Sequence, residues 1–197
     1  RPPCPPGRPD HRDGGCRLNS VRIIGGQFRR RVLKFPDSEG LRPTPDRVRE
    51  TLFNWLGQEL DGWHCLDLFA GSGALGFEAA SRGAARVVMI EQAPKVLAAL
   101  RENAEMLQNP RGVEIIRADA IQYLALPRTK FDLIFVDPPY KKGWIPRLEP
   151  LLPGALNEDG AVYIEAEHKI ESLGDWRTER HGRAGEVHFH LLRRQTA

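Results

Sequence analysis

The sequence is poor in cysteine and in long apolar runs, and each shortage excludes a class of protein. Its 197 residues include three cysteines, Cys4, Cys16 and Cys65, and none belongs to a C-x-x-C pair. A disulfide scaffold or a zinc ribbon is therefore not expected, and a reducing compartment, the cytoplasm, is predicted. No apolar run approaches the roughly 18 residues of a membrane span, and the first 19 residues lack the apolar stretch of a secretory signal.

The composition indicates a folded soluble chain, because 41% of the residues are hydrophobic and 28% are charged. The length suits one domain with a small appendage. Residues 1–19 are rich in proline, glycine and charge, and we predict a flexible extension there. Residues 20–40 are expected to form a basic β-hairpin, and residues 41–197 the main domain.

The net charge of +3 is unevenly distributed along the chain. Residues 17–49 hold nine arginines and lysines against three acids, whereas residues 50–197 hold 17 basic and 21 acidic residues. A basic arm beside an acidic body is typical of a protein with a polyanionic partner.

Arginine supplies most of the charge of the predicted hairpin. Two strand-like runs, Val21–Ile24 and Phe28–Phe35, flank the pair Gly25-Gly26, which predicts a turn. Arg29, Arg30 and Arg31 are consecutive. Charges of this kind can merely protect an edge strand from aggregation. Three in a row exceed that need, so contact with phosphate groups is favoured.

From residue 44 onward the pattern predicts an α/β fold. Thr44 and Pro45 are typical of a helix start, with Thr44 as the N-cap. Apolar strands then alternate with helical patterns, which indicates a parallel sheet covered on both faces. The final strand has no helix after it and is expected to be antiparallel. The predicted strands are residues 65–69, 87–90, 113–116, 131–136, 161–164 and 186–192, and the predicted helices lie near 74–82, 94–107, 119–125 and 143–152.

A glycine-rich turn follows the first of these strands, in Asp67-Leu-Phe-Ala-Gly71-Ser-Gly73-Ala-Leu-Gly76. Such a turn places backbone N–H groups against a ligand, and Glu91, 20 residues after Gly71, could hold ribose hydroxyls. Asp67 would repel a pyrophosphate but suits a cationic ligand such as S-adenosylmethionine. Asp119 could accept a hydrogen bond from an adenine, cap the following helix, or do both.

A second motif, Asp137-Pro138-Pro139-Tyr140, ends the most apolar strand. Two prolines cannot continue a central strand, so the motif is expected above the carboxyl edge of the sheet. Asp137 and the Pro138 carbonyl could accept the two N–H bonds of a nucleobase amino group, and Tyr140 could stack on an extruded base.

These motifs, in this order, resemble those of class I, Rossmann-like methyltransferases that use S-adenosylmethionine. More narrowly, Val21–Gly26, Leu41–Asn54, Asp67–Gly76 and Phe135–Tyr140 resemble the RsmD family, bacterial enzymes that methylate N2 of one guanine in 16S ribosomal RNA. The resemblance covers about residues 20–195, and its Arg-Pro-Thr segment, residues 42–44, is specific to the family.

The resemblance implies a seven-stranded, mostly parallel sheet with an antiparallel last strand, and a substrate in an assembled or assembling small subunit. A monomer is expected. The implied cofactor-binding residues are Asp67, Phe69, Gly71, Ser72, Gly73, Gly76, Glu91, Asp119 and Ala120. Asp137 to Tyr140 would hold the target base as catalytic residues, and Arg42, Thr44 and Arg47, with Arg29, Arg30 and Arg31, would contact the RNA.

Two other activities fit parts of the pattern. The Asp137–Tyr140 motif also permits an adenine-N6 methyltransferase acting on DNA or RNA, although the chain has no room for a DNA-recognition domain. The glycine turn and Glu91 alone would fit a dinucleotide-dependent oxidoreductase, which leaves Asp67 and the arginines without a role. His181, His188 and His190 have no acid or cysteine at ligand spacing, so no metal site is predicted.

Overall fold

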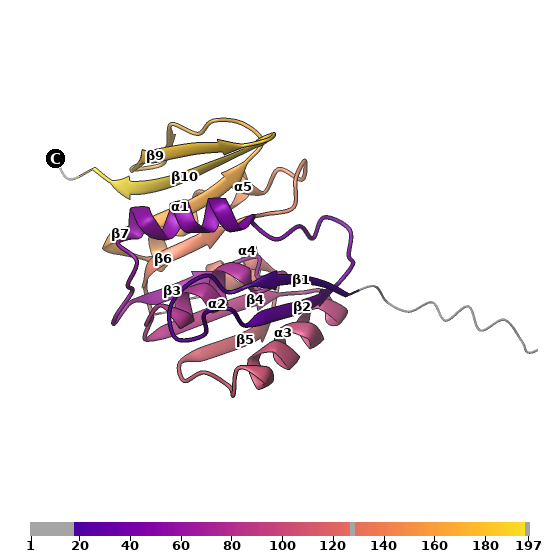
Figure 1. Cartoon of the computed structure of the whole chain (residues 1–197). Helices are drawn as coiled ribbons and strands as arrows, with labels where there is room; N and C mark the ends of the chain where they lie inside the picture. The colour runs from indigo at the N-terminus through magenta and orange to yellow at the C-terminus, as the bar shows by residue number, and fades with distance from the viewer. Residues whose placement is uncertain (1–17, 127–128, 196–197) are drawn as a thin grey trace, which may run out of the picture.

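The computed structural model describes residues 18–126 and 129–195, which form one sheet with helices on both faces and a separate hairpin (Figure 1). The predicted extension lies outside the described residues, except that Leu18 and Asn19 already belong to the first strand. The elements are β1 (Leu18–Arg22), β2 (Val32–Pro36), α1 (Asp46–Leu56), β3 (His64–Asp67), α2 (Ala74–Ser81), β4 (Arg86–Glu91), α3 (Pro94–Met106), β5 (Val113–Arg117), α4 (Ala120–Ala125), β6 (Phe131–Val136), α5 (Trp144–Leu148), α6 (Leu152–Ala155), β7 (Leu156–Ala166), β8 (Ser172–Leu173), β9 (Trp176–Ala184) and β10 (Val187–Arg194).

The main sheet has the strand order β5-β4-β3-β6-β7-β10-β9-β8. Its first five strands are parallel, and β10 runs antiparallel between β7 and β9, as predicted for the last strand. The two-residue β8 makes eight strands where seven were expected. The single helix predicted near residues 143–152 is instead two short helices, α5 and α6.

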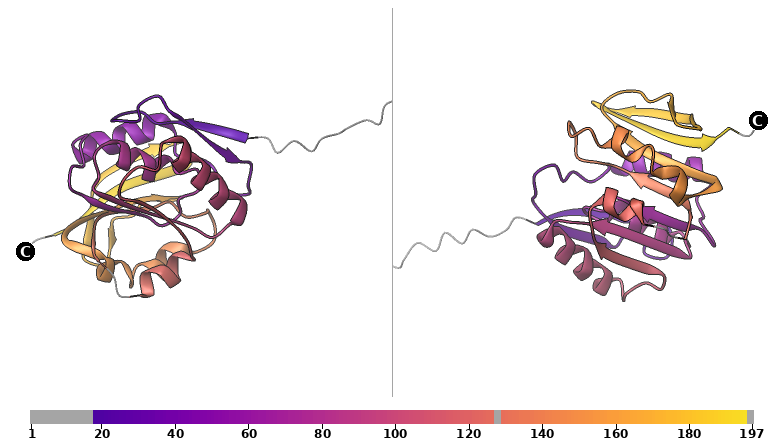
Figure 2. Two further views of the ribbon diagram at one scale, coloured as in Figure 1. Left: turned by 90° about the horizontal axis from the view of Figure 1, so that it is seen from below. Right: turned by 180° about the vertical axis from the view of Figure 1, so that it is seen from behind.

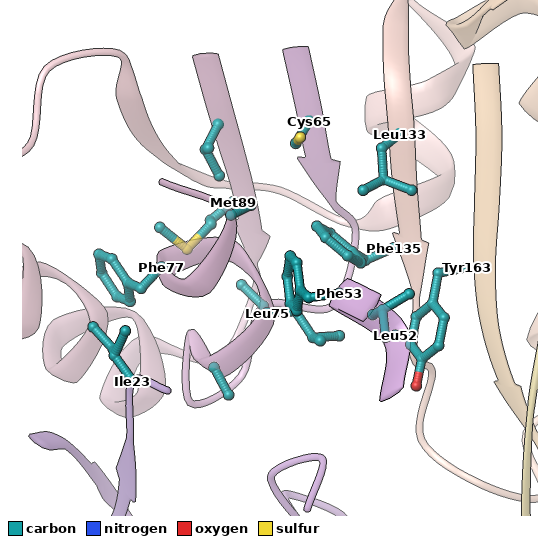
Figure 3. Packing of buried hydrophobic residues seen from close by; sticks show 14 of the residues in the cluster. Ile23, Leu52, Phe53, Cys65, Leu75, Phe77, Met89, Leu133, Phe135 and Tyr163 are labelled. Atoms are coloured by element: carbon teal, nitrogen blue, oxygen red, sulfur yellow. The ribbon is translucent and has the colours of Figure 1, made fainter. Parts of the chain in front are cut away.

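Two apolar layers cover the sheet, one on each face, and the helices lie on both sides of the sheet (Figure 2). Neighbouring residues of a strand point to opposite faces, so Cys65 belongs to one layer and Leu66 to the other. The first layer joins the hairpin, α1, α2 and α3 to the sheet, and Figure 3 shows Phe53, Phe77 and Phe135 within it. The second contains residues of α4, α5 and α6. Both faces of the central parallel strands β3, β4 and β6 are thus buried, which leaves the carboxyl edge of the sheet for a ligand.

The turn predicted at Gly25-Gly26 is wrong in its form, because residues 23–31 make a longer connection between β1 and β2. The backbone N–H groups of Ile24 and Gly25 donate to the two carboxylate oxygens of Glu78, at 2.9 and 2.8 Å. Glu78 is fully buried, so it requires partners, and Arg49 and Arg82 also pair with it at 3.2 and 2.9 Å. This buried acid on α2, rather than a tight turn, determines the path of the hairpin connection.

Thr44 is not the N-cap of α1, contrary to the prediction. Pro45 occupies that position, and no side chain caps the helix. The Thr44 hydroxyl donates instead to the Glu165 carboxylate, 2.6 Å away. Both groups are buried, and a buried carboxylate loses more from a missing donor than an exposed helix end does. The guanidinium of Arg49 donates to the Thr44 carbonyl at 3.0 Å and fixes the chain before α1.

Candidate active site

A cavity of about 450 Å³ lies at the carboxyl ends of β3, β4 and β6, beneath the segment that joins β2 to α1. It unites most of the residues that the sequence singled out. Acids dominate its charged groups, with six carboxyl side chains against Arg42 and Lys142. Its predicted members are Asp67, Phe69, Gly71, Ser72, Glu91, Asp119, Ala120, Asp137, Pro138, Pro139, Tyr140, Arg42 and Thr44.

Glu91 ties the end of β4 to the glycine turn. One carboxylate oxygen accepts the N–H of Gly71 at 3.2 Å, and the other accepts those of Gln92 and Ala93 at 2.9 and 2.8 Å. These bonds hold the acid at the cavity wall, where its remaining lone pairs can accept from hydroxyl groups of a ligand.

Gly73 and Gly76 do not line the cavity. A Cβ on Gly73, whose φ is +79°, would meet the Phe77 ring at 2.5 Å, and one on Gly76 would meet the Met89 sulfur at 2.6 Å. The Gly73 N–H already donates to the Ala70 carbonyl at 2.7 Å. The close packing of α2 on the sheet therefore requires both glycines, whatever their place in ligand binding.

Asp67 is buried at the end of β3, and only one of its oxygens is satisfied. Oδ2 accepts the N–H of Gly76 at 3.1 Å, whereas Oδ1 has no hydrogen-bond partner among the described residues. Burial raises the pKa of Asp67 to about 7, and the N–H groups of Gly76 and Phe69 oppose that rise. A buried carboxylate oxygen without a donor is a site for a cationic or N–H-bearing ligand group.

Asp119 is the N-cap of α4, one of the two predicted roles. Its Oδ1 accepts the N–H groups of Ile121 and Gln122 at 2.9 and 3.1 Å. The side chain is held at the rim of the cavity, so the cap does not exclude a contact with a bound ligand.

The Asp137–Tyr140 motif leaves β6 on the side of the cavity that faces Thr44. The Thr44 hydroxyl lies 3.5 Å from Asp137 Oδ2. Burial, followed by the charges of Glu165 and Asp67, raises the pKa of Asp137 well above its usual value. The Tyr140 ring is 41% exposed, and burial and the charge of Asp137 raise the pKa of its hydroxyl, so the phenol stays neutral.

Glu165 belongs to this site and was missed at the sequence level. It lies near the end of β7, is 4% exposed, and lines the cavity with Asp137. A signal was present, because an acid follows the apolar run Ala161–Ile164 just as Asp137 follows β6. Burial raises the pKa of Glu165, while hydrogen bonds from Thr44, Tyr163 and Asp137 lower it.

Comparisons with known proteins identify the family of this chain. Residues 21–193 match the family model described as "Conserved hypothetical protein 95". The chain is 40% identical over 193 residues, or 95% of each chain, to "Ribosomal RNA small subunit methyltransferase D" of Escherichia coli (strain K12). The chain belongs to the RsmD family.

Other relatives support the assignment to the RsmD family. The Haemophilus influenzae protein with the same printed name is 41% identical over 152 residues, which cover 75% of this chain and 79% of that one. A solved structure of the Escherichia coli protein yhhF superposes with a TM-score of 0.80, at 40% identity over 91% of this chain and all of that one. The fold also matches an RNA methyltransferase from Salinibacter ruber, at 19% identity and a TM-score of 0.63 over 79% of this chain and 96% of that one. The fold is therefore that of the class I methyltransferases.

The arginines predicted to bind substrate lie in two places. Arg42 lines the cavity near Tyr140, and Arg47 is exposed on the first turn of α1 without lining it. Arg29, Arg30 and Arg31 are exposed in the hairpin connection, which docks on Ser81 through the N–H groups of Gln27 and Phe28. Ser81 ends α2, whereas Ala74 at its start lines the cavity, so the hairpin connection docks at the end of α2 that is farther from the cavity, about 10 Å along the helix axis.

Two tryptophans, Trp144 and Trp176, differ in their surroundings. Trp144 lines the cavity, with its ring centroid 5.1 Å from that of Phe69, and its indole N–H has no partner among the described residues. Trp176 is buried in the core, and its N–H donates to the Gly160 carbonyl at 3.1 Å.

Three histidines form a cluster on β9 and β10, and none of them lines the cavity. The nearest ring nitrogens of His181, His188 and His190 lie within 4.8 Å of one another, a spacing that could hold a metal ion. Both ring nitrogens of His190 have backbone partners: Nδ1 lies 3.2 Å from the Ile164 carbonyl oxygen, and Nε2 accepts the Ile170 N–H at 3.0 Å. That the protein has no metal site therefore stays a prediction.

Within the described part of the chain, no helix has the length and apolar character to span a membrane.

Proposed function

We propose that this protein transfers a methyl group from S-adenosylmethionine to the exocyclic N2 of a guanine in 16S ribosomal RNA of the small subunit. The relative from Escherichia coli (strain K12), 40% identical over 95% of the chain, is named as a ribosomal RNA small subunit methyltransferase. One cavity holds both the unpartnered Asp67 oxygen and the Asp137–Tyr140 motif, and this arrangement carries the chemical part of the proposal.

The residues around the glycine turn suit the cofactor. S-adenosylmethionine would supply an electrophilic methyl group on a sulfonium, together with an ammonium and an adenosine. Asp67 Oδ1, buried and without a donor among the described residues, would bind the ammonium. A ligand with a pyrophosphate would be repelled by this carboxylate. Glu91 would accept from the ribose hydroxyls and Asp119 from the adenine amino group. Phe69, Gly71, Ser72 and Ala120 would form the walls between them.

The second half of the cavity would hold the target base. Asp137 and the Pro138 carbonyl would accept the two N–H bonds of the amino group, orienting its nitrogen toward the methyl donor. Such acceptors matter because the lone pair of this nitrogen is delocalised into the ring, which makes it a weak nucleophile. The half-exposed Tyr140 ring would stack on a base turned out of its helix.

Arginines on two sides of the site would contact the RNA backbone. Arg42, Thr44 and Arg47 would meet the RNA next to the target base, and Arg29, Arg30 and Arg31 would contact phosphates farther away. A substrate that spans both regions is larger than a nucleotide, and an assembled or assembling small subunit would meet this requirement. The protein would act on it as a monomer in the cytoplasm.

Methylation of purified small subunits and of their naked RNA with labelled S-adenosylmethionine tests this function. Digestion of the product to nucleosides and mass spectrometry should yield N2-methylguanosine at one position. Detection of N6-methyladenosine would instead support the adenine-N6 alternative. If neither the subunits nor the naked RNA became labelled, an activity on this RNA would be contradicted.

Replacing Arg29, Arg30 and Arg31 by alanine should weaken RNA binding and flatten its salt dependence. Each lost phosphate contact is expected to lower the slope of log K against log salt by up to about one unit, because fewer counterions are released. The measurement is a filter-binding titration at several salt concentrations. The triple alanine variant of the exposed Arg177, Arg180 and Arg183 on β9 is the matched control, and equal slopes for wild type and hairpin variant would show that the hairpin does not touch RNA.

A further inference from the structure

We propose that Glu165 recognises the N1–H of the target guanine and so makes the site selective for guanine over other purines. Since the target base is that of the proposed function, this role rests on it. Glu165 would be a specificity-determining residue that touches the substrate beside Asp137, within the same cavity.

Glu165 is held as an acceptor. Its Oε1 receives two hydroxyl hydrogen bonds, from Thr44 at 2.6 Å and from Tyr163 at 2.8 Å. Among residues 18–126 and 129–195, no lysine or arginine forms an ion pair with it. An acid that is 4% exposed and has no cation is costly to keep in a fold, which points to a ligand that supplies further donors.

Glu165 and Asp137 act as a pair. The two carboxyl groups share a hydrogen bond, and the Thr44 hydroxyl lies between them, 2.6 Å from Glu165 and 3.5 Å from Asp137. Two acceptors this close need a proton between them when no ligand is bound. A ligand with two adjacent N–H donors would satisfy both carboxyl groups in place of that single proton.

The Watson–Crick edge of guanine has this pattern. Its N1–H and its N2 amino group are neighbouring donors, so Asp137 can accept from N2 while Glu165 accepts from N1. Adenine instead presents an N1 lone pair next to its amino group, and this lone pair would face the Glu165 carboxylate without a proton. The pair of acids would therefore reject adenine even though the Asp137–Tyr140 motif alone would admit it.

The test uses reconstituted small subunits with 2-aminopurine at the position where the labelling experiment finds N2-methylguanosine. This base keeps the 2-amino group but has an unprotonated N1. We expect the wild type to methylate guanine with a kcat/KM roughly 10- to 100-fold above that for 2-aminopurine. In Glu165→Gln the amide can donate to N1, and the ratio should move toward 2-aminopurine by roughly tenfold.

Two controls separate recognition from folding. Glu158→Gln, at an exposed position of the same strand, should keep the wild-type ratio. Cofactor binding, measured by calorimetry, reports whether Glu165→Gln is folded. A Glu165→Gln variant that binds the cofactor like the wild type and keeps the wild-type ratio would overturn the proposal. A wild type that methylates both bases equally well would overturn it without any variant, whereas a wild type inactive on guanine would contradict the proposed function itself.

Discussion

Replacing Asp137 by alanine should lower the rate of methyl transfer by about 1000-fold while S-adenosylmethionine still binds within about threefold of the wild-type affinity. Asp137 is expected to hold the amino group of the base, and its carboxyl group contacts Thr44 and Glu165 rather than the glycine turn. Removing it should therefore lower kcat and leave the cofactor half of the cavity intact.

Single-turnover kinetics on small subunits, together with calorimetry for the cofactor, check this expectation. Asp159→Asn, an exposed acid on β7, is the matched control and should behave as wild type. Equal losses of cofactor affinity and methyl transfer in Asp137→Ala would assign Asp137 to the cofactor instead. An active Asp137→Ala variant would remove the carboxylate from the mechanism altogether.

Local sequence patterns predicted the parts of the site that depend on where a strand ends. Asp67 and Glu91 each end an apolar strand, and Asp137 directly follows one. In a parallel sheet the carboxyl ends meet at one edge, so the convergence of these acids follows from topology. Glu165 also lies near the carboxyl end of a strand, but unlike Asp137 it is not part of a recognisable sequence motif. Its importance appears only through the hydroxyl groups of Thr44 and Tyr163.

The remaining errors come from long-range contacts. Thr44 has the local features of an N-cap, but a buried carboxylate 121 residues away takes its hydroxyl. The Gly25-Gly26 pair has the features of a tight turn, but Glu78 binds the backbone N–H groups of Ile24 and Gly25. In both cases the deciding partner lies far along the chain, where periodicity and capping rules have no information. Strand β9 escaped prediction for another reason: four of its nine residues are charged and five are exposed, so it has no apolar run.

The affinity for S-adenosylmethionine should fall about tenfold when the pH is lowered from 8 to 6. Asp67, with a pKa of about 7, would have to be ionised to bind the ammonium, and each pH unit below that pKa costs a factor of about ten in the ionised fraction. Because burial raises this pKa, the unliganded fold binds more protons than the unfolded chain, so its free energy of unfolding should decrease as the pH rises through 7.

Asp67→Asn separates the charge from the shape of this site. The amide can still accept the Gly76 N–H, which holds the glycine turn, but it carries no charge for a cation. We expect cofactor affinity about 100-fold below that of the wild type at pH 8, since a buried charge pair loses one partner, and no change between pH 8 and 6. Calorimetry at both pH values measures this, with Asp159→Asn as the control that keeps the wild-type pH dependence. An affinity that still falls at pH 6 in Asp67→Asn would assign the titrating group to another acid of the cavity, such as Glu91 or Asp137.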